Sequence, residues 1–159
     1  MEKEKKQARK SAAKQAADII KKFEGFESGP YLCPANVPTI GYGTTIYADG
    51  TKVSMDDDAI DEDRATEELL HHIKAVEKQV NAVLDVKLKA HQKAALISFV
   101  YNVGIGNFTK STLLRKVNHC SDDQHIPDEF RRWTKGGGKV LRGLIRRREK
   151  EVELWTGSC

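Results

Sequence analysis

Apolar residues recur at helical spacing over most of this chain. Between residues 11 and 23 they return every three or four positions, which is typical of a helix with one buried face. A longer stripe with the same period predicts a helix over residues 62–84, with the apolar members Leu69, Leu70, Ile73, Val76, Val80, Val83 and Leu84. Shorter periodic segments predict further helices over residues 91–103, 109–118, 128–133 and 144–155.

One region breaks the helical period and predicts a β-hairpin. Its strands are expected within residues 39–47 and 51–53, on either side of Asp49-Gly50, a pair that favours two-residue hairpin turns. The preceding residues 27–36 contain glycine and prolines and are interpreted as turns.

These elements predict an α+β, mainly helical fold in a single domain of 159 residues. Residues 1–10 are expected to fray, because they alternate lysine and glutamate with almost no apolar side chains. A small N-terminal lobe with the hairpin is expected over about residues 11–60. A long helix over about residues 61–85 would connect it to a helical C-terminal lobe over about residues 86–157.

A cluster of acidic residues precedes the long helix. It comprises Asp56, Asp57, Asp58, Asp61, Glu62 and Asp63. We interpret these acids as capping groups that also complement the helix dipole. They lack the spacing and the glycine of a calcium-binding loop, so no metal is expected there.

Composition and charge indicate a soluble protein with a mildly basic surface. Hydrophobic residues make up 39% of the chain and charged residues 31%, with a formal net charge of +4 and a pI near 8.9. Charge alone permits a polyanionic partner but does not favour one over an ordinary basic protein. The run Arg146-Arg147-Arg148 is interleaved with apolar residues, so it is interpreted as the polar side of a packed helix, and no nucleic-acid partner is expected.

The chain shows no targeting signal. Lys14, Gln15 and Asp18 interrupt the N-terminal apolar residues, which argues against a secretory signal. No segment approaches the ~18 apolar residues of a membrane span, so no stable membrane insertion is expected. The three cysteines, Cys33, Cys120 and Cys159, are too few for a disulfide scaffold, and cytosolic synthesis would leave them reduced.

Candidate chemistry lies around the first turn. Glu24 stands between Phe23 and Gly25-Phe26, a setting that could desolvate its carboxyl and raise its pKa. Cys33 and Thr39 follow closely enough to fold back toward it and form a catalytic pair with it. The alternative is structural, with a capping or surface glutamate, a packed thiol and a threonine that starts a strand.

Alternation along the expected strand adds a detail to this site. Thr39, Gly41 and Gly43 would share one face, opposite to Ile40 and Tyr42. Small residues on that face would let a ligand approach the backbone.

Two histidine-containing segments are not interpreted as metal sites. His71 and His72 are adjacent, so their side chains diverge by ~100° on a helix. His119, Cys120 and His125 fit no common zinc spacing and are interpreted as a surface loop. No metal or other cofactor is therefore expected.

The spacing Glu24-x8-Cys33-x5-Thr39 resembles the Glu-x8-(Asp/Cys)-x5-Thr signature of phage-type lysozymes, the endolysins of glycoside hydrolase family 24. The resemblance extends over roughly residues 12–157. Segments similar to the family's hairpin entry, central helix and C-terminal helices are residues 39–44, 92–104, 131–133, 136–138 and 143–155.

The resemblance implies a lysozyme-like muramidase that cleaves the β-1,4 bond between N-acetylmuramic acid and N-acetylglucosamine. Glu24 would be the general acid, and Cys33 and Thr39 would handle the attacking water. Inversion by two carboxylates needs ~6.5–9.5 Å between them, to leave room for that water. The resemblance also implies that Tyr101, Asn102 and Ser111 could face the substrate; the alternatives are interior packing for Tyr101 and helix capping for Ser111.

Cys33 stands where many members of the family carry aspartate. A thiol of pKa ~8.5 is mostly neutral at pH 7, and a nearby Glu24 anion would raise that pKa further. Two roles stay open: a thiolate that acts as base or nucleophile, or a neutral thiol that positions water.

Three other functions compete with hydrolysis. They are lytic transglycosylation of the same bond by Glu24 alone, a non-catalytic wall- or nucleic-acid-binding module, and, more remotely, a zinc amidase. The Glu24–Cys33–Thr39 spacing favours hydrolysis.

The resemblance also implies where the protein works. It would be synthesised in the host cytoplasm, released through a holin-type lesion, and act as a monomer on periplasmic peptidoglycan, toward which its positive charge would help to draw it. In that oxidising compartment Cys120 and Cys159 could pair, and oxidation of Cys33 would lower activity.

Overall fold

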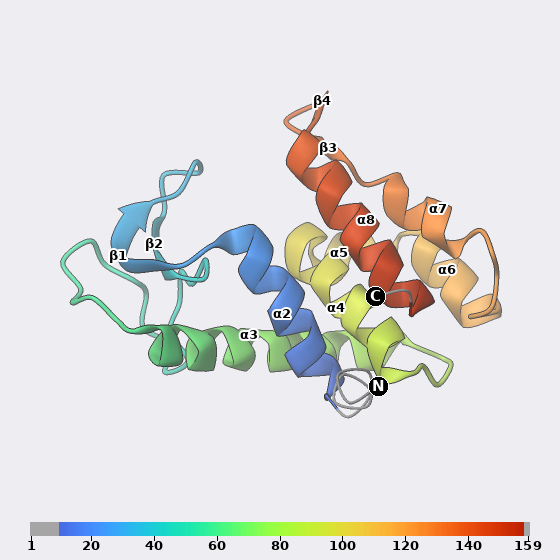
Figure 1. Ribbon diagram of the computed structural model, residues 1–159, viewed down its shortest axis with the longest axis horizontal. Helices are drawn as coiled ribbons and strands as arrows, with labels where there is room; N and C mark the ends of the chain where they lie inside the picture. Colours follow the sequence, from blue (N-terminus) through green and yellow to red (C-terminus); the bar gives the residue numbers. More distant parts are fainter. Residues whose placement is uncertain (1–9, 158–159) are drawn as a thin grey trace.

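A computed structural model describes residues 10–157 and consists mainly of helices (Figure 1). In chain order the elements are α2 Ala12–Glu24, β1 Glu27–Leu32, β2 Pro38–Gly41, α3 Glu62–Val83, α4 Ala90–Val103, α5 Ile105–Thr109, α6 Thr112–His119, α7 Ile126–Arg131, β3 Lys135–Gly136, β4 Lys139–Val140 and α8 Arg142–Thr156. The predicted mainly helical α+β fold is confirmed.

Helix α3 joins the two ends of the molecule. In Figure 1 it runs beneath the others, from the β1–β2 sheet on the left to the bundle of α4–α8 on the right. Asp61 caps it: a carboxylate oxygen accepts a hydrogen bond from the backbone N–H of Arg64 at 2.8 Å. Glu62 and Asp63 lie in its first turn, near the positive end of the helix dipole. The capping interpretation is confirmed for Asp61, and Glu62 and Asp63 lie where the dipole interpretation placed them.

The sheet lies earlier in the chain than the sequence predicted. Strands β1 and β2 pair antiparallel, with Tyr31 opposite Thr39. The predicted hairpin around Asp49-Gly50 is present as a short antiparallel pairing outside the named strands. An isolated bridge joins Ile46 and Lys52, and the N–H groups of Tyr47 and Val53 donate to the carbonyls of Thr51 and Thr45 at 2.8 and 2.9 Å. β1 was mistaken for turns because it contains Gly29 and Pro30. The ladder tolerates them because its register shifts between Glu27 and Tyr31, and a proline, which has no N–H, is accommodated at such irregularities.

Helix α2 packs with the helical body, which differs from the expected division of the chain. Ala13, Ala16 and Ile20 are buried in the same core as residues of α4, and α4 is the main packing partner of α2. Residues 11–60 therefore do not form one lobe by themselves. Glu24, at the end of α2, is held by the helical body, whereas Thr39 is held by the sheet.

The core of the helical body centres on α4. Every residue from Ala94 to Val100 is buried. The ring of Phe99 meets the rings of Phe108, Phe130 and Trp133 edge-on, with centroids 5.5–6.1 Å apart. Helix α8 packs across α4 and brings the buried charged residues Arg147, Arg148 and Glu151 to this core.

A second, very short hairpin precedes α8. No strand is predicted over residues 135–140, but Lys135–Gly136 and Lys139–Val140 pair as strands β3 and β4. Gly137 and Gly138 connect them with φ angles of 58° and 80°. These left-handed conformations favour glycine, which explains why a triple-glycine run makes a tight turn here.

Candidate functional site

The carboxyl group of Glu24 lies at the junction of the sheet and the helical body. Its side chain is 32% exposed. A Cβ placed on Gly43 would come within 3.0 Å of Glu24 Oε2, so any larger residue there would displace the carboxyl group. Gly43 also has a φ of +83°, which favours glycine independently. The backbone after β2 therefore forms one wall beside Glu24.

The expected alternation of Thr39, Gly41 and Gly43 on one face is wrong. The strand ends at Gly41, and Ile40 pairs with Thr44, so the chain turns sharply. A Cβ on Gly41 would meet Ala65 of α3 at 3.0 Å. Gly41 thus allows close packing on α3, and Gly43 alone of these glycines faces Glu24.

Arg147 of α8 reaches Glu24 from the interior. Its Nη1 lies 3.5 Å from Glu24 Oε1, and the arginine itself is buried. Its other nitrogens are held as well: Nη2 donates to the carbonyl of Ser98 at 3.1 Å, and Nε lies 3.4 Å from Glu151 Oε2. The guanidinium also lies 5.6 Å from the ring centroid of Phe23. Arg147 is therefore fixed on several sides and presents one edge to Glu24.

Behind Arg147 lies a fully buried ionic cluster. Glu151 accepts hydrogen bonds from the hydroxyl of Ser98 at 2.6 Å and from Arg148 Nη1. Arg148 Nε donates to the carbonyl of Trp133 at 2.9 Å. Burial raises the pKa of Glu151 and lowers that of Arg148, while their opposite charges counteract both shifts. With Glu24 included, two arginines face two carboxylates, so the charges balance.

Cys33 and Thr39 lie together at the far end of the sheet. Thr39 is buried, and its hydroxyl donates to the carbonyl of Val37 at 2.8 Å. Cys33 directly follows β1 and is partly exposed. Hydrogen bonds from the backbone of Val37 and, to a smaller extent, of Ala35 lower the pKa of the Cys33 thiol, against an opposing effect of burial. The expected rise in that pKa is therefore wrong, because the turn supplies hydrogen bonds that stabilise the thiolate.

The pKa values of two tyrosines respond to the charge of Glu24. Burial raises the pKa of Tyr31 on β1, and the charges of Glu24, Glu27 and Cys33 raise it further. Burial raises the pKa of Tyr101 on α4 to about 12, with a further contribution from Glu24 and an opposing one from Arg147. Tyr31 thus lies within electrostatic reach of both Glu24 and Cys33, which the sequence did not indicate, and Tyr101 on α4 lies within electrostatic reach of Glu24.

The two remaining candidates are held by other contacts. Asn102 is exposed, and its Oδ1 accepts a hydrogen bond from Arg148 Nη2, which attaches it to the ionic cluster. Ser111 caps α6: its hydroxyl accepts from the N–H of Leu114 at 3.1 Å and donates to the carbonyl of Phe108 at 2.6 Å. The capping alternative for Ser111 is what the structure supports.

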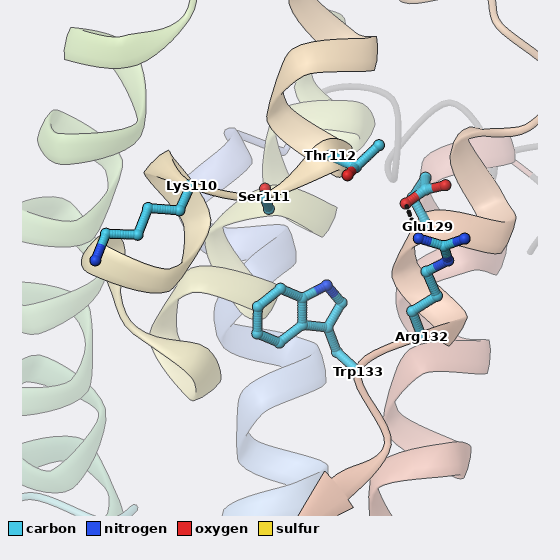
Figure 2. Close-up of a pocket in the computed structure, with 6 residues that line it drawn as sticks. All are labelled: Lys110, Ser111, Thr112, Glu129, Arg132 and Trp133. Carbon is cyan, nitrogen blue, oxygen red and sulfur yellow. Dashed lines mark ion pairs between the residues drawn. The ribbon is translucent and has the colours of Figure 1, made fainter.

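Ser111 also lines a pocket of about 370 Å³ whose lining includes none of Glu24, Cys33 and Thr39. Figure 2 shows its lining residues Lys110, Ser111, Thr112, Glu129, Arg132 and Trp133, with the indole between the turn before α6 and the ion pair on α7. Glu129 is paired with Lys116 at 3.0 Å and with Arg132 at 3.7 Å. The Glu129 carboxylate is thus held in the wall of this pocket by two cations.

Two other expectations concern metals and disulfides. Within residues 10–157 no three His, Cys, Asp or Glu side chains gather as a metal site would require. Cys120 is exposed, but Cys159 lies outside the described residues, so their pairing stays a prediction. In the same described range, no helix is both long and apolar enough to span a membrane.

Similarities to known proteins cover most of the chain. The family described as phage lysozyme matches residues 21–151, which include Glu24, Cys33 and Thr39. A SAR-endolysin of Bacteriophage PS119 is 40% identical over 135 residues, 84% of this chain and 77% of that protein. The structure of an endolysin from Escherichia coli O157:H7 phage FAHEc1 is similar with a TM-score of 0.84 and 30% identity, over 95% of this chain and 96% of that one. A variant of P22 lysozyme has a TM-score of 0.78 and 30% identity, over 89% and 94%.

Proposed function

Because the chain belongs to the phage lysozyme family, and is therefore a glycoside hydrolase that lyses peptidoglycan, we propose that it hydrolyses one particular bond. This bond is the β-1,4 link between N-acetylmuramic acid and N-acetylglucosamine. The observation that carries the proposal is the placement of Glu24: a partly exposed carboxyl group between Gly43 and the buried Arg147. A fixed, accessible carboxyl group is what protonation of a glycosidic oxygen requires.

In this proposal Glu24 is the general acid. It gives its proton to the leaving glycosidic oxygen as the bond to the anomeric carbon breaks. A water molecule attacks that carbon from the opposite side, and its proton passes to Cys33, with Thr39 helping to hold the water. The lowered pKa of Cys33 supports the thiolate as the group that accepts this proton.

A clearing assay on outer-membrane-permeabilised bacteria tests these roles. We expect Glu24→Gln to lower the rate about 10²–10⁴-fold, because general acid catalysis contributes that much. Glu27→Gln is the matched control: Glu27 is a nearby exposed acid on β1, and its loss should leave the rate unchanged. If Glu24→Gln clears cells at the wild-type rate while its circular dichroism is unaltered, the proposal fails and a non-catalytic binding module becomes the better description.

The thiolate role of Cys33 has a separate test. In a Cys120→Ser/Cys159→Ser background, we expect the rate of iodoacetamide alkylation to rise with pH around a midpoint lower than that of a cysteine in an unstructured peptide. Cys33→Asp should retain clearing activity, whereas Cys33→Ser should lose it. A Cys33→Ser enzyme with full activity would limit the side chain to positioning water.

Lytic transglycosylation of the same bond is the alternative reaction. It would use Glu24 alone and leave anhydro-muramic ends, so its products would be lighter than hydrolysis products by one water. Mass spectrometry of the soluble fragments separates the two reactions. The position of Thr39 beside Cys33 favours hydrolysis, since transglycosylation needs no group to hold a water.

We also propose that the enzyme is made in the host cytoplasm and acts, as a monomer, on the periplasmic wall after holin-type release. Relatives named endolysins support a lytic role at the cell wall. Expression in bacteria with and without a separate membrane-disrupting agent tests it. Lysis only when the inner membrane is opened is the expected result.

A further inference from the structure

Three large aliphatic side chains within six residues are exposed around the start of α8. Val140 at the end of β4 is 56% exposed, Leu141 44% and Ile145 41%. Lys139, Arg142 and Arg146 flank them in the chain, and all three aliphatic side chains are in contact with water. A cluster of exposed aliphatic side chains is typical of a surface that binds another protein or a membrane.

The same segment is strongly basic. Between Arg132 and Arg148 the chain contains no aspartate or glutamate. Lys135, Lys139, Arg142 and Arg146 are all exposed, and among the described residues none of them forms an ion pair. We call this surface the cationic apolar patch, defined by Lys135, Lys139, Val140, Leu141, Arg142, Ile145 and Arg146.

The patch lies apart from the residues around Glu24. Arg147 points inward to Glu24, and Ile145 precedes it by two positions on the same helix, so their side chains diverge by ~200°. The strands β3 and β4 project beyond the N-terminal end of α8, at the top of the view in Figure 1. Ile145 therefore lies on the outward side of α8, and the strand residues of the patch lie on the protruding hairpin.

We propose that the cationic apolar patch docks the protein on the surface of an anionic phospholipid bilayer. Cations beside a bilayer are attracted by its acidic headgroups, and exposed aliphatic side chains gain free energy by entering the headgroup–acyl boundary. A hydrated polyanion such as a nucleic acid or an anionic wall polymer would engage the cations equally well. It would offer Val140 and Ile145 no apolar medium, however, so the combination favours a membrane surface.

Docking of this kind is peripheral and reversible. Three aliphatic side chains and four cations do not anchor a protein permanently, in contrast to a spanning helix. The binding does not require bond cleavage. Glu24→Gln should therefore bind vesicles as the wild-type protein does, and a failure of the proposed reaction would leave this inference untouched.

Sedimentation with lipid vesicles tests the proposal. Vesicles of equal parts phosphatidylglycerol and phosphatidylcholine should carry the protein down at low salt, and vesicles of phosphatidylcholine alone should not. Lys139→Gln/Arg142→Gln should lower the partition coefficient about 25-fold, since each cation contributes about fivefold near such a surface. Val140→Ser/Ile145→Ser should lower it at least tenfold, while both variants keep the unfolding midpoint of the wild type.

Met55→Ser is the matched control. Met55 is also a large exposed apolar residue, at 47%, but it lies beside Asp56, Asp57 and Asp58. Its loss should leave vesicle binding unchanged. The proposal is overturned if anionic vesicles do not bind the protein, or if the cation variant loses binding while the Val140→Ser/Ile145→Ser variant keeps it. The second result would identify a simple polyanion site.

Discussion

The two sides of α8 depart at four positions from the usual arrangement of an amphipathic helix, although Val152, Leu154 and Trp155 are buried and Arg146, Lys150 and Glu153 are exposed as usual. Its inward side carries Arg147, Arg148 and Glu151, all buried, whereas its outward side exposes Ile145. An ordinary surface helix places apolar residues inside and charged residues outside. On this helix, a charged side chain is buried where the surrounding residues offer it hydrogen-bonding partners. Residue type alone does not determine which side chains are buried.

The inward charges are tolerated because their hydrogen-bonding groups find partners. Arg147 meets Glu24, Glu151 and the carbonyl of Ser98, and Arg148 meets Glu151, Asn102 and the carbonyl of Trp133. Arginine does not lose its proton in proteins, so a missing partner would leave a buried positive charge. The cluster thereby fixes the guanidinium that faces Glu24.

The largest effect is expected from Glu151→Gln, which leaves two buried arginines short of a counter-charge. We expect the free energy of unfolding to fall by about 3–5 kcal/mol, as when one partner of a buried ion pair is removed. Urea denaturation with an unchanged m-value measures it. Glu149→Gln is the control on the exposed side: its pair with Arg131 is half exposed, so its loss should cost less than about 1 kcal/mol. Equal costs would show that the inward cluster is no more important than a surface pair.

Ser98→Ala should have the second-largest effect. The Ser98 hydroxyl donates to Glu151 inside the cluster, and a hydrogen bond to a charged group contributes about 1.5–3 kcal/mol. Stability should fall within that range in the same denaturation experiment. A loss below half a kcal/mol would indicate that the arginines alone satisfy Glu151.

Ser111→Ala probes a serine that caps a helix outside the cluster. Its hydroxyl caps α6, so its loss should cost about 1 kcal/mol. Peptidoglycan clearing by the folded variant should keep the wild-type rate, because the side chain is committed to the backbone. A drop in rate at unchanged stability would restore Ser111 as a substrate contact.

Ile145→Ser tests the outward side and should have the smallest effect. Replacing a side chain that is in contact with water removes few packing contacts, so the free energy of unfolding should change by no more than about 0.5 kcal/mol. Thermal unfolding measures it. A loss of several kcal/mol would mean that Ile145 is covered in solution and that the contrast between the two sides of α8 is false.

Periodicity predicted the helices well and the strands poorly. The stripe from Leu69 to Val80 repeats over several turns, so the long helix was identified to within a few residues. β1 was missed because Gly29 and Pro30 are turn residues in most contexts, and their tolerance depends on a register shift between two paired strands. Local sequence carries no information about such a partner.

The residues of the candidate site were also only partly predictable from the sequence. Spacing and family resemblance identified Glu24, Cys33 and Thr39, but they did not reveal Tyr31 or Arg147 beside them. The three consecutive arginines look alike in sequence, and only their directions around α8 separate Arg146 in water from Arg147 and Arg148 inside. A hint was present, since Glu151 follows Arg147 and Arg148 at the spacing of helical ion pairs.

The sequence by itself determined the helices, the long connection between the two ends of the molecule and the acid that we propose to be catalytic. The helices depend on local periodicity, and the acid was singled out because its spacing to Cys33 and Thr39 resembles a family signature. The chain carries both along its length. The tertiary structure decided that α2 joins the helical body, that hydrogen bonds from a turn lower the pKa of Cys33, and that α8 buries charge while exposing Ile145. Each of these depends on residues brought together by folding, because the free energy of a buried charge or thiolate is set by the groups that surround it.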